Sequence, residues 1–100
     1  LNMQAMMDLG SIFELTGDSA SAIQYYLEVD KKYPWFPGVQ LKIAGIKSQQ
    51  NAHEIALRYL ARGITYQPAD TSLYVLAGKE YTAIDNYKEA LESFKMALKK

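Results

Sequence analysis

The chain has no cysteine and a single histidine among its 100 residues, and its eleven acidic and eleven basic side chains cancel. Without cysteine there are no disulfides, no thiol catalysis and no zinc–thiolate sites. His53 has no second histidine or carboxylate at ligand spacing, which argues against a metal centre and a histidine general base. The balanced charge gives no sign of a nucleic-acid partner or of an anionic membrane surface.

Two further absences concern membranes and phosphate groups. No apolar run approaches the ~20 residues that span a bilayer, and no signal-peptide pattern opens the chain. The six glycines are too dispersed to form a phosphate-binding loop. No group of residues in the sequence has the composition and spacing of a catalytic site. We therefore expect a protein that is not an enzyme and needs no metal or cofactor, and we do not expect it to insert into a membrane.

What the chain does have is a repeat of 34 residues. This offset aligns Ala22 with Ala56 and Ala90, and it aligns most of the chain with itself. A fixed period of this size is typical of stacked units, each burying its apolar face on the next. The units run from about 3 to 36, 37 to 70 and 71 to 100, the last lacking its final residues. We expect one domain, spanning residues 1–100, that is a segment of a longer protein.

Each unit divides into two amphipathic helical stripes, which predicts six helices of roughly 10–14 residues. The breaks inside the units fall at Gly17–Asp18, Gln49–Asn51 and Asp85–Asn86. Gly17 suits a left-handed helix end, and Asp18 can cap the helix that follows. Pro37 is expected in the first turn of its helix, where a missing N–H costs nothing.

Small residues recur where paired helices should touch. Gly10, Ala44 and Gly78 share one place on the first helices, and each is expected to let two backbones approach closely. Glycine inside a helix costs about 1 kcal/mol relative to alanine, so its use suggests a packing demand. A large residue of the second helix is expected to fill the space beside each close approach of the helices. These large residues are Tyr26, Leu60 and Phe94.

These residues resemble tetratricopeptide repeats, whose pattern is a large residue, Leu-Gly, an aromatic, Ala, a large apolar residue, a small one and Pro. The first unit carries the pattern at Met6, Leu9, Gly10, Phe13, Ala22, Tyr26, Val29 and Pro34. The third carries it at Tyr74, Ala77, Gly78, Tyr81, Ala90, Phe94 and Ala97. The second unit departs from it, because Gln40 and Lys47 stand where large apolar or aromatic residues are usual.

The resemblance implies an all-α fold, a right-handed α-α superhelix of three antiparallel helix pairs. It also implies a concave face, built mainly from the first helix of each unit, that holds a protein or peptide partner. The groove positions matched in this chain are Met7, Ser11, Leu41, Lys42, Gly45, Val75, Leu76 and Lys79. Chaperone-binding members hold a C-terminal carboxylate with Lys, Asn and Arg on this face. Those clamp positions correspond in this chain to Met7, Ser11, Lys42, Ser72 and Leu76. Only Lys42 among these five is basic and none is Asn or Arg, so that role is not expected.

Two hypotheses remain open for the groove. Met7, Leu41 and Val75 occupy equivalent places, so they either form an apolar strip that seats a partner segment or pack against neighbouring helices and only border the groove. Lys42 and Lys79 either add charge beside that strip or are ordinary solvated surface.

The turn Tyr33–Gly38 is unusual because it contains three aromatic residues and two prolines. An exposed aromatic cluster would indicate a contact surface. We favour the alternative, in which Trp35 or Phe36 covers the seam between the first and second units.

The last helix should be partly bare. Leu91 and Leu98 have no following helix to cover them, which predicts self-association through that end or low stability. The leading hypothesis is an interaction module that binds a peptide or helix in its groove or scaffolds an assembly. The alternatives are a structural or oligomerisation segment of a longer array, and an accessory domain of an enzyme with no ligand of its own.

Overall fold

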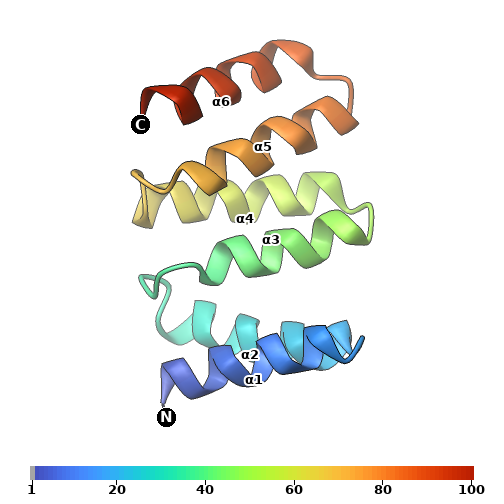
Figure 1. The fold of residues 1–100 in the computed structure, drawn as a ribbon, viewed down its shortest axis with the longest axis vertical. Coiled ribbons are helices and arrows are strands. Elements are labelled where there is room, and N and C mark those ends of the chain that lie inside the picture. The colour runs from blue at the N-terminus through green and yellow to red at the C-terminus, as the bar shows by residue number, and fades with distance from the viewer. Residues whose placement is uncertain (1) are drawn as a thin grey trace.

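The computed structural model describes residues 2–100. The helices are α1 (Met3–Leu15), α2 (Ser19–Lys32), α3 (Val39–Gln49), α4 (His53–Tyr66), α5 (Thr71–Ala83) and α6 (Tyr87–Lys99). The described residues contain no strand, so the all-α prediction and the six expected helices are confirmed. The helices are stacked in chain order with the two termini at opposite ends, in a body of 40 × 25 × 19 Å (Figure 1).

The turn inside each unit has the same backbone in all three copies. Gly17, Asn51 and Asp85 all have positive φ, at 85°, 60° and 61°. In each copy the amide of the next residue donates to the carbonyl five residues earlier, at 2.8–2.9 Å. This bond closes a helix end through a left-handed residue. The predicted break at Gly17 is confirmed, and two polar residues adopt the same conformation in the other units.

Of the two helix starts predicted from Asp18 and Pro37, one is confirmed and one is wrong. The Asp18 side chain accepts from the Ser21 amide at 3.0 Å, which confirms the predicted cap of α2. The expectation for Pro37 is wrong, because α3 begins only at Val39. Gly38, with a φ of 88°, completes the turn first, so Pro37 lies before the helix.

The close approach of paired helices at small residues is confirmed. A Cβ at Gly10 would lie 2.5 Å from the Tyr26 ring, and one at Gly78 would lie 2.6 Å from the Phe94 ring. The second unit has Ala44 at this place, and Ala44 shares a buried cluster with Leu60, the counterpart of the two aromatic residues. Small and large residues are therefore matched pair by pair.

The core lies along the two seams between units. One buried cluster joins the first and second units, and the other joins the second and third. Phe36 packs against the first cluster, as we favoured. Trp35 does not cover the seam: it is 57% exposed and meets Tyr33 edge to face, with ring centroids 5.7 Å apart. The backbone of the turn directs Phe36 inward and leaves Trp35 outside.

Candidate functional site

The eight predicted groove residues lie on α1, α3 and α5, but their apolar members differ in exposure. Met7 is only 7% exposed and belongs to the first core cluster. Leu41 and Leu76 are partly buried against the second cluster, whereas Val75 is 36% exposed. The accessible apolar surface at these positions therefore comes from Leu41, Val75 and Leu76 more than from Met7.

Gly45 opens a gap in the middle of this face. A Cβ placed on it would have no heavy atom within 4 Å. Its counterparts in the first and third units are Ser11 and Lys79. Lys79 and Lys42 are exposed, and within residues 2–100 neither forms an ion pair. Free positive charge therefore borders an open, partly apolar surface.

The hydroxyl group of Ser11 on α1 is already engaged with Tyr26 of α2 inside the protein. The Tyr26 hydroxyl donates to Glu14 Oε1 and lies 3.3 Å from the Ser11 hydroxyl. Burial of Tyr26 and the hydrogen bond to Glu14 raise the pKa of the phenol to about 12. Tyr26 is therefore neutral at physiological pH and remains a donor to Glu14. This pair braces α1 against α2 and is not available to a ligand.

A buried carboxylate links α3, α4 and α5. Glu80 is 3% exposed and accepts from Ser48 Oγ at 2.8 Å, while His53 Nδ1 lies 2.9 Å from its other oxygen. Sequence reasoning missed this cluster, although one indication existed: the counterparts of Glu80 in the other units are the isoleucines Ile12 and Ile46. The described residues contain no group of three or more His, Cys, Asp or Glu side chains that could hold a metal ion.

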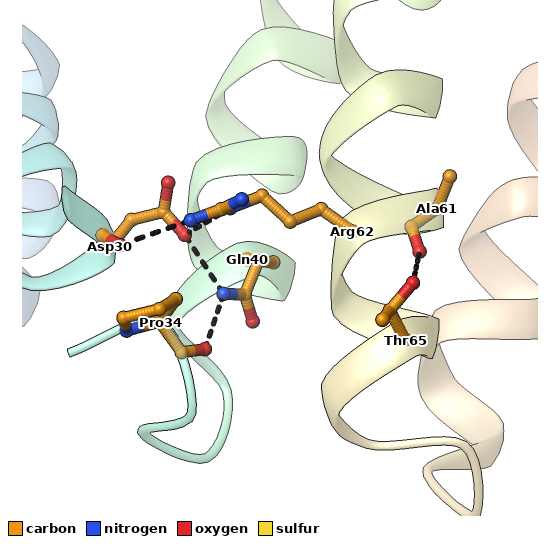
Figure 2. A network of polar contacts seen from close by, with 6 residues as sticks. All are labelled: Asp30, Pro34, Gln40, Ala61, Arg62 and Thr65. Atoms are coloured by element: carbon orange, nitrogen blue, oxygen red, sulfur yellow. Dashed lines mark hydrogen bonds and ion pairs between the residues drawn. The ribbon is translucent and has the colours of Figure 1, made fainter.

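A second polar cluster lies in the seam between the first two units (Figure 2). Asp30 of α2 is 8% exposed and accepts from Gln40 Nε2 at 2.8 Å and Arg62 Nε at 2.9 Å. The hydrogen bond to Asp30 raises the pKa of the Arg62 guanidinium, which stays charged. A buried carboxylate with two donors is satisfied, whereas one that has lost its partner is costly. The cluster thus ties α2, α3 and α4 together.

The structure gives Gln40 a role that the sequence comparison of units did not suggest. Its Nε2 also donates to the Pro34 carbonyl at 2.6 Å. In the third unit the counterpart Tyr74 donates through its hydroxyl to the Pro68 carbonyl, at 3.1 Å. The two prolines are counterparts as well. Gln40 therefore replaces the usual aromatic residue in the same hydrogen bond and adds the contact with Asp30.

Two hollows of the surface lie away from the predicted groove. One of about 310 Å³ is lined by Asn51–Ile55 and Ile84, at the turn ends of α4 and α5. Another of about 180 Å³ lies between α4, α5 and α6, with Leu57, Tyr81 and Met96 in its wall. Neither wall contains any of the eight predicted groove residues.

Comparison with family models agrees with this architecture. The model of the tetratricopeptide repeat matches residues 4–31 and 71–99, which together exceed half of the chain. The chain belongs to the tetratricopeptide repeat family. A comparison with curated proteins gives no match. The two matched segments lie in the first and third units, and the second unit, which carries Gln40 and Lys47, lies outside both.

Tetratricopeptide repeats are generally protein–protein interaction modules and typically have no catalytic activity of their own. This assignment supports a protein or peptide as the class of partner. None of the helices among residues 2–100 has the length and apolar character needed to cross a bilayer.

Proposed function

We propose that this tetratricopeptide domain binds a peptide or helix across the face of α1, α3 and α5. The observation that carries the proposal is the open position at Gly45: apart from its chain neighbours and the adjoining backbone of α3, no heavy atom lies within 4 Å of a Cβ placed there. A backbone without a side chain lets a ligand approach a helix closely. Leu41 lies one turn before Gly45 on α3 and Val75 lies on α5, which packs against α3, so both can offer apolar contacts near the open position.

The charges on this face favour a particular ligand chemistry. Lys42 and Lys79 are exposed and have no carboxylate partner within residues 2–100. Ser11 is already engaged with Tyr26. The ligand therefore meets apolar surface and free ammonium groups, which suits an amphipathic segment with apolar anchors and acidic flanks.

The structure also decides which substitutions test the proposal. Met7 is nearly buried, so a charge there would disrupt the core as well as the surface. Gly45→Trp places a large side chain into open space and leaves the core untouched. Gly45→Ala is the matched control, because one methyl group fills little of the gap.

The experiment selects binders from a library of amphipathic 16-residue peptides and measures the affinity of the selected peptide by fluorescence anisotropy. Gly45→Trp should weaken binding by tenfold or more, since blocking a central contact costs about 1.4 kcal/mol or more. Val75→Glu should also weaken it, and Leu15→Arg should leave it unchanged. Equal affinity for wild type and Gly45→Trp, with helical content preserved by circular dichroism, would refute binding on this face.

A further inference from the structure

Each unit carries a hollow at the same place on its second helix. In the second unit the hollow has about 210 Å³ and is lined by Ile55, Arg58, Tyr59 and Arg62 of α4. The residues 34 positions earlier, on α2, line a hollow of the first unit. The residues 34 positions later, on α6, line the hollow of about 180 Å³ between α4, α5 and α6, which we call the α4–α6 hollow. The fold therefore produces the hollow, and the side chains of each unit set its chemistry.

The α4–α6 hollow lies inside the stack and not on its end. Its walls come from three helices of two successive units. Leu91 and Leu98 lie on another side of α6 and do not line it; they are 55% and 90% exposed, as predicted for this helix. Helices stacked on that other side would leave the hollow open, because α5 and α6 follow α4 and leave the hollow on α4 open.

The wall of the α4–α6 hollow is mostly apolar. Leu57 and Ile64 of α4 and Met96 of α6 are half-buried in it. The volume of the hollow is below the ~300–1,000 Å³ of small-molecule pockets. The hollow therefore has the size to receive one inserted side chain and not a drug-sized ligand.

The rim of this hollow is acidic. Glu89 and Glu92 of α6 line it and are exposed. Within residues 2–100 Glu89 forms no ion pair, and Glu92 has only a loose one with Lys95, at 3.8 Å between side chains that are 63% and 62% exposed. No lysine or arginine among the described residues lines the hollow, whereas the second unit has Ile55 and Arg58 at the places of the two glutamates. Charge complementarity therefore favours a cation here.

The first seam shows which cation fits between two second helices. There Arg62 of α4 extends to α2, where its Nε donates to Asp30 at 2.9 Å, and its guanidinium carbon lies 5.5 Å from the centroid of the Tyr66 ring. In the second seam the counterparts of Arg62 and Asp30 are Met96 and Ile64, which both line the α4–α6 hollow. The second seam thus has no arginine of its own at the place where the first seam has one. Arginine joins an apolar stem to a head that pairs with carboxylates.

We propose that the α4–α6 hollow binds an arginine side chain from a basic segment of a partner protein. The methylene stem lies along Leu57, Ile64 and Met96, and the guanidinium reaches Glu89 and Glu92. The face of α1, α3 and α5 carries free ammonium groups and favours acidic flanks. The two sites therefore select segments of opposite charge, and the two proposals stand or fall separately.

The test is an NMR titration of the 100-residue chain, followed through the amide signals of α6. The probe is a Gly-Ser decapeptide with one central arginine, which should bind with a dissociation constant of about 1 mM or below. In one control peptide citrulline replaces the arginine and removes its charge. In the other, 2-amino-3-guanidinopropionic acid keeps the charge and removes most of the stem. Each replacement should weaken binding about fivefold or more.

Variants of the protein locate the bound arginine. Glu92→Gln should weaken binding about threefold, and Glu89→Gln with Glu92→Gln about tenfold, because partly exposed ion pairs are individually weak. Met96→Arg gives the second seam the residue of the first, so the chain's own guanidinium should fill the hollow and abolish binding. Glu54→Gln is the matched control, because Glu54 lies in the first turn of α4, as Glu89 does in α6, and is outside the hollow. Glu54→Gln and Gly45→Trp should both bind like the wild type.

Three results would overturn the proposal. The first is the absence of any saturable shift on α6 up to about 10 mM peptide. The second is equal affinity for the arginine and citrulline peptides. The third is unchanged binding by Met96→Arg, or by the double glutamine variant, with helical content preserved by circular dichroism. A loss of binding in Gly45→Trp alone would place the arginine on the opposite set of helices and would also overturn it.

Discussion

The same substitution, glycine to alanine, should have three different outcomes at three helical glycines of this chain. At Gly45 the added methyl group meets open space. At Gly10 it would lie 2.5 Å from the ring of Tyr26, and at Gly78 it would lie 2.6 Å from the ring of Phe94. The gain from replacing a helical glycine is common to all three sites, about 1 kcal/mol. Differences in stability among the three variants therefore report how tightly a side chain of the second helix packs against each glycine.

The expected sizes follow from how freely each neighbour can move. Gly45→Ala should raise the free energy of unfolding by about 1 kcal/mol. Tyr26 is fully buried and bonded to Glu14. Overpacking there costs about 1–3 kcal/mol and the strained hydrogen bond about 1 more, so Gly10→Ala should destabilise by about 2 kcal/mol net. Phe94 is 38% exposed and can turn outward, so Gly78→Ala should stay within about 1 kcal/mol of wild type.

The assay is urea unfolding followed by circular dichroism. A double variant, Gly10→Ala with Tyr26→Leu, recreates the alanine–leucine pair of the second unit. The two changes should be less harmful together than their separate effects predict, by about 1–2 kcal/mol. If Gly10→Ala were as stable as Gly45→Ala, or if the double variant showed no coupling, the steric argument would be refuted.

Three further predictions concern seams, pH and turns. Arg62→Met should destabilise by about 1–3 kcal/mol in urea unfolding, because it leaves Asp30 with one side-chain donor, Gln40, in a buried site. Adding Asp30→Ile and Gln40→Tyr gives the first seam the residues found at the second, Ile64, Tyr74 and Met96. This triple variant should recover most of the lost stability. No recovery would show that the polar cluster is needed for packing. The raised pKa of Tyr26 means that the folded state binds the phenolic proton more tightly than the unfolded state does. Stability should therefore fall between about pH 10 and 12, and Tyr26→Phe should show a shallower fall in pH-dependent unfolding. Asn51→Gly should stabilise by about 0.5–1 kcal/mol in thermal unfolding, since the residue has a φ of 60°, and a lower midpoint would count against this.

Features that recur every 34 residues were predictable from the sequence. The helix pair, the turn at Gly17 and the pairing of Gly10 with Tyr26 each have a counterpart in all three units. Each copy therefore strengthens the prediction made from the other two. The resemblance to a family located the groove positions but not their burial. Met7 matches a groove position, yet it is 7% exposed because α1 packs close to the first core cluster.

Features that occur once were not predictable in the same way. Gln40 looked like a defect of the second unit, because its partner Asp30 lies on another helix and only the folded chain brings them together. Glu80 and His53 are 27 residues apart, and no repeat of the pair points to their contact.

The polar cluster at Asp30 has a consequence for how this chain can change by recombination. If the third unit were spliced directly behind the first, Tyr74 and Met96 would stand where Gln40 and Arg62 now stand. Asp30 would then lose both side-chain donors while remaining enclosed. A deletion of the second unit would thus yield an unstable product, although the other two units are intact. The first unit therefore requires the second unit directly behind it, because that unit supplies both side-chain donors to Asp30.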